Sequence, residues 1–403
     1  MSQFADVIVN ERAAGANQSY PDWLEHILSR KGFASAFTEI SSWPAYKPTP
    51  LIKLSNLARE FGFADIIYKD EAGRFGLGSF KALGGAYAVS QVLARELAKH
   101  GVTQSASCAE LASGKFAAAV RDITVTSATD GNHGRSVAWG ARLFGCRAVI
   151  FIHETVSESR REAIARYGAE VIRVRGHYDD AVRHAFAEAA RRGWHVVQDT
   201  ALGNYRETPT EITYGYGVIA QEILDTIDEP PTHVLVQAGV GGLASAICAR
   251  FWQAWGVRRP RFIVFEPTRA ACVAASLAAG RRTTLTGNID SVMAGLSCGE
   301  VSELAWDVLA AGADGAVVID DQLALQGMRI LADPFGDDPP IVGGECSGGA
   351  IGALMTLAQN RELAARLGMN EDARILLIGT EGATDPSIYR NVVGRAPEEV
   401  ATA

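Results

Sequence analysis

Residues 233–252 read HVLVQAGVGGLASAICARFW, the pattern of a buried strand, a glycine-rich loop and a helix in immediate succession. The loop consists of Ala238, Gly239, Val240, Gly241, Gly242 and Leu243. Because backbone amides at a helix N-terminus bind anions, this segment predicts a phosphate site. The dinucleotide pattern GxGxxG would need glycine at position 244, which is alanine, so a single phosphate monoester fits better than a pyrophosphate.

Similar apolar runs recur along the chain and alternate with alanine-rich amphipathic segments such as SESRREAIARYGA at 157–169. The predicted strands include RAVIFI at 147–152, EVIRV at 170–174, HVVQD at 195–199, RFIVFE at 261–266 and RILLIG at 374–379. This alternation is typical of βαβ units, so we predict an α/β protein with parallel or mostly parallel sheets and helices on both faces. With 403 residues the chain is long enough for two lobes. We expect a small domain at 86–204 and a large domain at 1–85 plus 205–403.

The composition argues against several classes of partner. The net charge is −8 and no run rich in Lys and Arg occurs, so neither nucleic acid nor an anionic membrane is expected to bind. The chain shows no signal-peptide pattern and no apolar stretch as long as a membrane span, which predicts a cytoplasmic location. Cysteines and histidines form no metal-ligating pattern, so no metal is expected. Cys272 and Cys298 are expected to be packed thiols rather than a disulfide.

Lysine is scarce in this chain, which makes each lysine informative. There are seven lysines among the 38 basic residues, and only a lysine amine can form a Schiff base near neutral pH. Lys81 follows the glycine-rich segment GRFGLGSF and opens an apolar helix, ALGGAYAVSQVLA. Burial and the positive end of the helix dipole are expected to lower its pKa. The structural alternative is a lysine that extends from the helix start towards solvent.

A second polar loop, TDGNHG at 129–134, joins the predicted strand ITVTSA to the helix RSVAWGARLFG. Its amides are suited to a carboxylate, and Asn132 to a ring hydroxyl of a cofactor. The alternative is a polar turn in which Asp130 caps the helix. For His133 we favour a loop-stabilising role over acid-base chemistry. A nicotinamide site, with Glu266 as the ribose-binding acid, is a further alternative, but it leaves this loop without a role.

Four motifs taken together identify a family resemblance. SFK at 79–81, GNH at 131–133, GVGG at 239–242 and the strand that ends in Gly379-Thr380 are similar, in order and spacing, to the tryptophan-synthase-β family of fold type II pyridoxal-phosphate enzymes. Each motif alone is weak, and the combination is specific. The resemblance implies a two-lobed fold, a Schiff base between Lys81 and pyridoxal 5′-phosphate, a phosphate site at the glycine loop and Asn132 beside the pyridine hydroxyl.

The resemblance also assigns the remaining site residues. Those expected to bind the cofactor are Phe80, Lys81, Asn132, Gly239, Val240, Gly241, Gly242, Leu243 and Thr380. Those expected to bind the substrate are Thr129, Asp130, Gly131, His133 and Asp199. Thr380 is preferred over Thr384 as the hydroxyl at the ring nitrogen, because it directly follows the strand. Glu381 would change the electron demand of the ring if it faced the ring instead.

Longer strings point to one branch of this family. KDEAGRFGLGSFKALGGAYAV, ATDGNHGR, VVQDTA, the segment 343–349 and GTEGATDP are similar to the diaminopropionate ammonia-lyases over nearly the whole chain. Serine and threonine dehydratases carry a small residue before GNH, whereas this chain carries Asp130, and a carboxylate suits a substrate with a second ammonium group. The resemblance therefore implies α,β-elimination of D- and L-2,3-diaminopropionate to pyruvate and two ammonia. A serine or threonine dehydratase is the alternative.

The expected catalytic residues are Lys81, Asp130 and Asp199. We expect Lys81 to remove the α-proton of the L substrate and Asp130 that of the D substrate. Asp199 is expected to bind the substrate amine, with a structural acid as the second interpretation. Relatives are commonly homodimers, so a homodimer is expected.

Overall fold

A computed structural model describes residues 5–14 and 18–402, and the chain forms two compact units. Unit 1 comprises Met1–Arg30, Pro48–Ser79 and Ile219–Ala403, and unit 2 comprises Lys31–Lys47 and Phe80–Val218. The domains expected from the sequence, 1–85 plus 205–403 and 86–204, differ from these units at 31–47, 80–85 and 205–218. The expected small domain lies wholly inside unit 2.

Unit 1 is built on a seven-stranded sheet in the order β1-β10-β9-β8-β11-β3-β2. Its strands are β1 (Ala5–Val9), β2 (Leu51–Lys53), β3 (Asp65–Asp70), β8 (His233–Gln237), β9 (Arg261–Pro267), β10 (Gly315–Ile319) and β11 (Arg374–Gly379). The edge strands β1 and β2 run antiparallel to their neighbours, and all other pairs are parallel. In the parallel strands β8, β9, β10 and β11 nearly every side chain is buried, as expected for strands covered on both faces.

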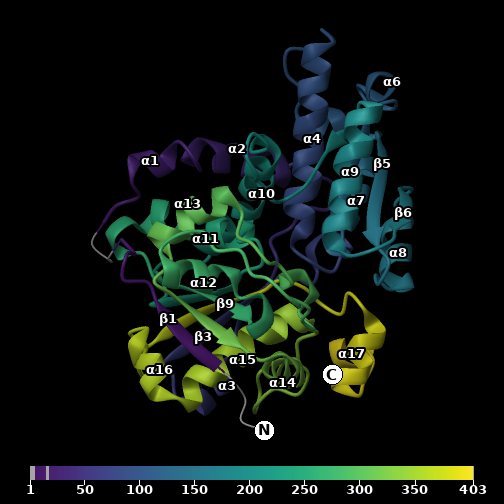
Figure 1. Ribbon diagram of the computed structural model, residues 1–403. Coiled ribbons are helices and arrows are strands. Elements are labelled where there is room, and N and C mark those ends of the chain that lie inside the picture. The colour runs from purple at the N-terminus through teal and green to yellow at the C-terminus, as the bar shows by residue number, and fades with distance from the viewer. Residues whose placement is uncertain (1–4, 15–17, 403) are drawn as a thin grey trace. The chain divides into compact units, whose positions relative to one another are not determined.

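Helices cover the sheet of unit 1 (Figure 1). They are α1 (Asp22–Glu25), α3 (Ser55–Phe61), α11 (Gly242–Trp255), α12 (Cys272–Ala279), α13 (Glu303–Gly312), α14 (Asp321–Ala332), α15 (Glu345–Gln359), α16 (Arg361–Arg366), α17 (Pro386–Val393) and α18 (Pro397–Ala401). Helix α15 is buried over most of its length and packs in one core with Leu235, Phe265 and Leu377 of the sheet. This core fixes the carboxyl ends of β8 and β11, where the glycine loop and Thr380 begin.

Unit 2 contains a four-stranded parallel sheet in the order β6-β5-β4-β7. Its strands are β4 (Thr124–Thr129), β5 (Arg147–His153), β6 (Glu170–Val174) and β7 (His195–Val196), and its helices are α2 (Arg30–Ser41), α4 (Lys81–Lys99), α5 (Cys108–Ala112), α6 (Ala117–Val120), α7 (Asn132–Phe144), α8 (Glu158–Ala165) and α9 (Tyr178–Arg192). Helix α10 (Glu207–Leu224) continues from unit 2 into unit 1. Val149 and Phe151 share a core with α9, whereas Ile150 contacts α7. Because side chains alternate along a strand, α7 and α9 cover opposite faces of this sheet.

These observations confirm the predicted α/β fold with mostly parallel sheets. Every strand named from the sequence is present, although HVVQD at 195–199 contributes only His195–Val196 to β7. Strands β1, β2, β3 and β10 were not predicted from the sequence. The two antiparallel edge strands are the departure from a purely parallel arrangement.

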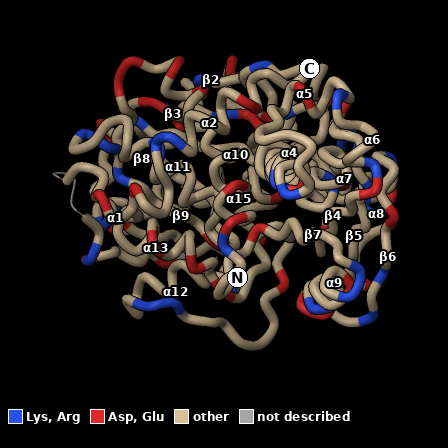
Figure 2. The backbone as a smooth tube through the Cα atoms, turned by 90° about the horizontal axis from the view of Figure 1, so that it is seen from above, with Lys and Arg blue, Asp and Glu red and all other residues tan. Residues whose placement is uncertain are grey.

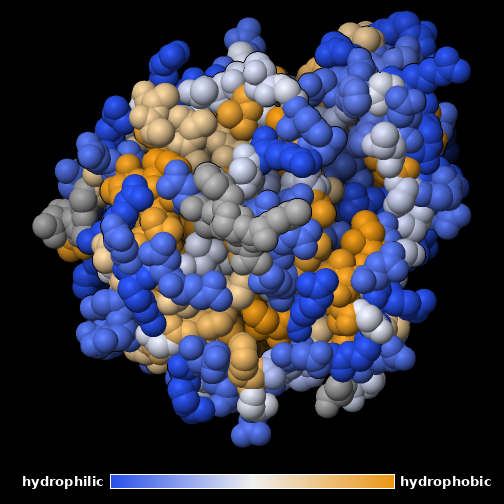
Figure 3. Space-filling view, turned by 60° about the horizontal axis from the view of Figure 1, so that its bottom comes forward, coloured by the Kyte–Doolittle hydropathy of each residue, from blue (hydrophilic) through white to orange (hydrophobic). Residues whose placement is uncertain are grey.

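The charged residues are dispersed along the chain. Figure 2 shows Lys and Arg interspersed with Asp and Glu along the backbone tube. In Figure 3, hydrophilic residues cover much of the visible face, with smaller hydrophobic areas between them. Within the described part of the chain, no helix has both the length and the apolar character needed to cross a membrane.

Candidate active site

Lys81 is the first residue of α4, and its amine lies in a cluster of polar groups within unit 2. The Nζ atom donates a hydrogen bond of 2.6 Å to Oδ2 of Asp199, which belongs to the segment that follows β7. The two side chains are 20% and 11% exposed, so this ion pair is largely shielded from water. The structure thus brings together two of the three residues expected to be catalytic, which lie 118 positions apart in the sequence.

The expectation of a lowered pKa for Lys81 is wrong. Burial acts to lower the pKa, but the carboxylate of Asp199 outweighs burial and holds the pKa of Lys81 well above the ordinary range of lysine. Conversely, burial acts to raise the pKa of Asp199, and the positive charge of Lys81 holds it well below its usual range. The sequence singled out Asp199 as a site residue but not as the partner of Lys81, because the contact joins residues 118 positions apart.

The loop at 129–134 is organised by the hydroxyl of Thr129. Its Oγ1 atom accepts hydrogen bonds from the backbone amides of Gly131 and Gly134, at 2.9 and 3.0 Å. Helix α7 begins at Asn132 with Gly131 as its N-cap, and the side chain that bonds an amide of its first turn is that of Thr129. The alternative in which Asp130 caps this helix is therefore wrong, since Asp130 is left partly exposed on the loop.

His133 is buried against the segment that carries Asp199. Its Nε2 atom lies 2.8 Å from the carbonyl oxygen of Val197, and its Nδ1 atom lies 3.9 Å from Oδ2 of Asp199. Burial lowers the pKa of His133, and the Asp199 carboxylate only partly opposes this. The Nδ1 atom has no hydrogen-bond partner among the described residues. The bond to Val197 is the kind of contact that a loop-stabilising histidine makes.

Sequence reasoning missed Tyr216, which lies in α10 beside the same lysine. The Lys81 amine is 5.8 Å from the centre of the Tyr216 ring and 5.5 Å from that of Phe80. The two rings pack edge to face with their centres 4.8 Å apart. No motif marks Tyr216, because the segment YGYGVIA reads as an ordinary apolar helix.

In unit 1, the loop between β8 and α11 is shaped for close approach to its backbone. A Cβ atom on Gly239 would lie 2.9 Å from the carbonyl oxygen of Gly295, so that position has no space for a side chain. Gly241 has a φ of 92°, in the left-handed region that other residues disfavour. The amides after it begin the 14-residue helix α11. This is the arrangement that binds phosphate groups in proteins.

Thr380, at the end of β11, is held by a neighbouring strand of unit 1. The Nε2 atom of Gln237, the last residue of β8, donates a 2.6 Å hydrogen bond to Oγ1 of Thr380. The hydroxyl proton of Thr380 therefore points to some other acceptor, as a ring-nitrogen contact requires. The carboxylate of Glu381 accepts from the amide of Cys346 at the start of α15, and its backbone pairs with Ser347.

The cysteines and Glu266 have structural contacts. Cys272 and Cys298 are both free thiols, in agreement with the interpretation as packed thiols. The carboxylate of Glu266 accepts hydrogen bonds of 2.8 and 2.7 Å from the amides of Val273 and Ala274 in the first turn of α12. Glu266 is fully buried and bonded to these two amides, so it is not available to bind a ribose. The nicotinamide alternative therefore has no ribose-binding acid.

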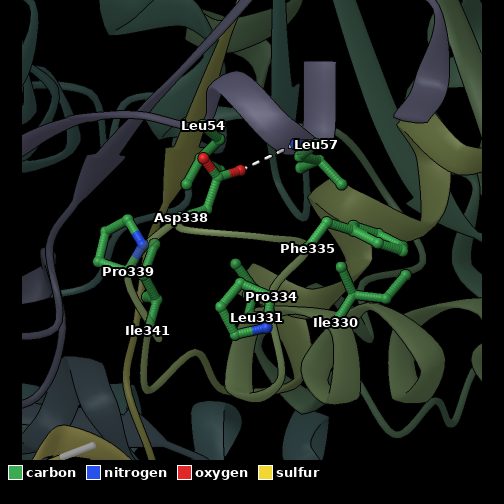
Figure 4. A pocket seen from close by; sticks show the side chains of 9 residues that line it. All are labelled: Leu54, Leu57, Ile330, Leu331, Pro334, Phe335, Asp338, Pro339 and Ile341. Atoms are coloured by element: carbon green, nitrogen blue, oxygen red, sulfur yellow. Dashed lines mark hydrogen bonds between the residues drawn. The ribbon is translucent and has the colours of Figure 1, made fainter. Parts of the chain in front are cut away.

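A small apolar pocket lies elsewhere in unit 1. Figure 4 shows the carboxylate of Asp338 directed at the start of α3, where it accepts hydrogen bonds from the backbone amides of Asn56 and Leu57. The rest of the lining is apolar and consists of Leu54, Leu57, Ile330, Leu331, Pro334, Phe335, Pro339 and Ile341. None of the expected site residues lines this pocket, so we assign it no catalytic role.

Comparison with known proteins defines the class. Residues 42–381 match the family model described as pyridoxal-phosphate dependent enzyme, so the chain belongs to this family. Its fold is the type II fold of these enzymes. More specifically, the chain is 39% identical over 362 residues to the diaminopropionate ammonia-lyase of Escherichia coli strain K12, covering 88% of this chain and 89% of that protein. It superposes on the crystal structure of holo diaminopropionate ammonia-lyase from Escherichia coli with a TM-score of 0.88 at 36% identity, covering 98% and 97% of the two chains.

A more distant relative shows where the similarity declines. The L-threonine dehydratase of Corynebacterium glutamicum is 25% identical over 231 residues, which cover 54% of this chain and 51% of that protein. The difference in identity and coverage separates the two branches of the family that the sequence left as alternatives.

The residues present fit pyridoxal phosphate. Unit 2 offers one primary amine, Lys81, in a largely buried setting beside a carboxylate. Unit 1 offers a loop at Gly239 and Gly241 that no side chain could occupy, and a hydroxyl at Thr380 that is oriented by Gln237. The Oε1 atom of Gln237 is buried and has no hydrogen-bond partner among the described residues. Buried acceptors are normally paired, so a donor is missing beside Thr380.

Proposed function

We propose that this protein is a diaminopropionate ammonia-lyase, which converts 2,3-diaminopropionate and water to pyruvate and two molecules of ammonia. The observation that carries the proposal is the pair of carboxylates in unit 2, Asp199 bonded to Lys81 and Asp130 on the neighbouring loop. The similarity to the Escherichia coli enzyme along nearly the whole chain supports it.

The cofactor groups are assigned by chemistry. Lys81 would hold the aldehyde carbon through its amine, and residues 239–243 would hold the phosphate with their backbone amides. Thr380 would place a neutral hydroxyl at the ring nitrogen, and Phe80 and Asn132 would contact the ring. When bound, pyridoxal phosphate supplies an electron sink for the bond at the substrate α-carbon.

The substrate carries two ammonium groups, and carboxylates are the natural partners for both. Asp199 already binds one ammonium group, that of Lys81, at 2.6 Å in a largely buried setting. We propose that it binds the substrate β-amine in the same way when Lys81 is engaged elsewhere. The amides of the loop at 129–134, with Thr129, Gly131 and His133, would hold the substrate carboxylate.

Two different residues would remove the α-proton from the two enantiomers. The neutral amine of Lys81 takes the proton of the L form at Nζ, and the carboxylate of Asp130 takes that of the D form. Since each base serves one stereochemical course, both enantiomers would be substrates. Asp130→Asn would then lose activity on the D substrate and keep most of it on the L substrate. Full activity of this variant on the D substrate contradicts the assignment.

The experiment that tests the function measures pyruvate release by the holoenzyme from D- and L-2,3-diaminopropionate, serine and threonine. We expect kcat/KM for 2,3-diaminopropionate to exceed that for serine and threonine by at least about tenfold, since a site with unpaired carboxylates disfavours a neutral hydroxyl. Lys81→Ala is the control and should release no pyruvate. A preference for serine or threonine would support the dehydratase alternative.

We further propose that the enzyme is a cytoplasmic homodimer, as relatives commonly are. The scarcity of cysteine pairs fits a reducing compartment. Light scattering coupled to gel filtration measures the mass of the assembly directly. A mass equal to one chain at micromolar concentration would refute the dimer.

A further inference from the structure

The phenol of Tyr216 is a polar group without an evident partner at the centre of the lysine cluster. The side chain is 1% exposed, and its hydroxyl has no hydrogen-bond partner among the described residues. The Lys81 amine, bonded to Asp199, lies 5.8 Å from the centre of its ring. Burial of a hydroxyl without a partner destabilises a protein, and phenylalanine would fill the same space without that cost. The hydroxyl therefore needs an explanation beyond packing.

The position of the phenol is fixed by the close crossing of α4 and α10. A Cβ atom on Gly84 would lie 2.5 Å from Cε1 of Tyr216, and one on Gly215 would lie 2.4 Å from the carbonyl oxygen of Leu83. Glycines at these points let the two helix backbones approach each other, and the Tyr216 ring packs edge to face against Phe80. The ring has no room to swing away. Within the described residues its hydroxyl makes no hydrogen bond of ordinary geometry, and Lys81 is the side chain that interacts with it.

The two polar neighbours of the Lys81 amine favour different protonation states. Asp199 favours the ammonium form, which has three donors and no acceptor. A phenol can donate its proton to the lone pair of a neutral amine, and the ammonium form offers no such lone pair. A hydrogen bond to the neutral form favours that form. The short separation of the two groups also affects the phenol: burial raises the pKa of Tyr216, and both the charge of Lys81 and a hydrogen-bonding interaction with its amine oppose the increase.

We infer that Tyr216 is a positioning residue for Lys81: its phenol donates to the neutral amine whenever the amine leaves Asp199, and so keeps it ready to attack an aldehyde or accept a proton. This inference rests on the proposed role of Lys81 and goes beyond it. In the reaction, Asp199 turns to the substrate amine, and Tyr216 is the group that receives the released lysine.

Tyr216→Phe tests the inference through cofactor capture by the apoprotein, without turnover. Below the pKa of Lys81, the rate at which added pyridoxal phosphate produces the absorbance band near about 410 nm is proportional to the fraction of neutral amine. One lost hydrogen bond to that form should slow capture about threefold to tenfold at pH 8. The final amplitude should be unchanged, because the lysine is still present.

Tyr214→Phe is the matched control. Tyr214 lies in the same helix, packs against Phe33 with ring centres 5.1 Å apart, and has no contact with Lys81 among those described. Its capture rate should equal that of the wild type. A Tyr216→Phe variant that captures the cofactor as fast as the wild type overturns the inference, and so does an equal slowing in Tyr214→Phe.

A second measurement keeps the inference testable if Tyr216→Phe does not fold. Replacement of all tyrosines by 3-fluorotyrosine makes each phenol a stronger donor and should speed capture, whereas no change or a slower rate would count against the contact. Failure of the proposed function is distinguishable. Wild-type protein that binds the cofactor but releases no pyruvate from diaminopropionate refutes the function and leaves the capture experiment intact.

Discussion

At the residue scale, the protonation state of Lys81 depends on which side chain its amine contacts, Asp199 or Tyr216. Its amine is bonded to Asp199, and the pair holds both groups charged. A buried charge without a partner destabilises a protein. The pair avoids this for both the carboxylate and the ammonium group. We propose that the same carboxylate binds another ammonium group, that of the substrate, once Lys81 holds the cofactor. An acid that can exchange one ammonium for another suits a diamine substrate.

The pair gives a pH-dependent contribution to stability. The pKa of Asp199 is lowered by folding, so its contribution is present above the unfolded value near about 4 and is lost as the pH falls below it. The pKa of Lys81 is raised by folding, so its contribution is present below about 10.4 and is lost as the pH rises through the folded value. Asp199→Asn should therefore destabilise the apoprotein by about 2 kcal/mol at pH 7, and by progressively less as the pH falls below about 4 towards the low folded pKa.

Urea unfolding of the wild type and Asp199→Asn across this pH range measures the difference. Asp130→Asn is the control, and its effect should stay within about 0.5 kcal/mol because Asp130 is partly exposed. A destabilisation by Asp199→Asn that shows no decrease between pH 7 and about pH 2 would show that the ion pair is not its source.

At the scale of elements, buried ion pairs hold the segment that leads to Lys81. Arg74 bonds Glu71 at 2.8 Å and Glu222 at 2.7 Å, and Lys69 bonds Glu222 at 2.7 Å, with all four side chains at most 2% exposed. These contacts tie β3, the turn Arg74–Gly76 and the end of α10 together within unit 1. Two positive and two negative charges balance, so the cluster is stable only when complete.

Arg74→Ala should therefore destabilise the protein by about 3–5 kcal/mol, because two buried carboxylates lose a shared partner. Urea unfolding at pH 7 measures this. Lys99→Ala, which breaks an exposed pair with Glu96, is the control and should cost less than about 0.5 kcal/mol. A loss below about 1 kcal/mol for Arg74→Ala would mean that water reaches the cluster.

The glycine loop between β8 and α11 makes a second prediction at this scale. Gly241→Ala forces an alanine into a φ of 92° and places its Cβ atom 2.9 Å from that of Ala305. We expect the strain to shift the loop and weaken pyridoxal phosphate binding about tenfold, measured by fluorescence or absorbance titration.

Gly394→Ala is the matched control, because Gly394 has a φ of 83° but no atom within 4 Å of the added Cβ. It should lose a similar amount of stability from backbone strain and keep its cofactor affinity. If both variants bind the cofactor as tightly as the wild type, the loop does not hold the phosphate.

At the scale of the whole molecule, the residues that we propose to hold the cofactor come from both units. The lysine, its carboxylate and the loop at 129–134 belong to unit 2, and the glycine loop and Thr380 belong to unit 1. A ligand that binds the folded chain and not the unfolded chain stabilises it by mass action. Groups from both units should therefore contribute to cofactor-linked stability.

Pyridoxal phosphate at about 100 times its dissociation constant should stabilise the wild type by about 2.7 kcal/mol. At the same concentration Lys81→Ala should gain less, since it keeps the phosphate loop but cannot form the covalent bond. Pyridoxine 5′-phosphate, which lacks the aldehyde, should stabilise both proteins equally. Urea unfolding with and without each compound checks this. Equal stabilisation of wild type and Lys81→Ala by pyridoxal phosphate would contradict the role of Lys81.

Local sequence patterns were sufficient for the fold class and for the positions of the loops. Alternating strands and helices, the glycine loop after HVLVQ and the helix that starts at Lys81 are all encoded within short segments, because periodicity and backbone freedom are local properties. Strands β1, β2, β3 and β10 were not predicted: β1 and β2 are edge strands, β3 is only half buried, and β10 lies in an alanine-rich stretch without a distinctive boundary.

The electrostatics of the site could be decided only by the tertiary structure. The partner of Lys81 comes from a segment 118 residues away, and Tyr216 owes its place to two glycines that let α4 and α10 meet. Charge interactions and steric contacts act through space, so they depend on which distant segments fold together. The sequence therefore predicted the lysine as a site residue, and the fold revealed that its pKa is raised rather than lowered.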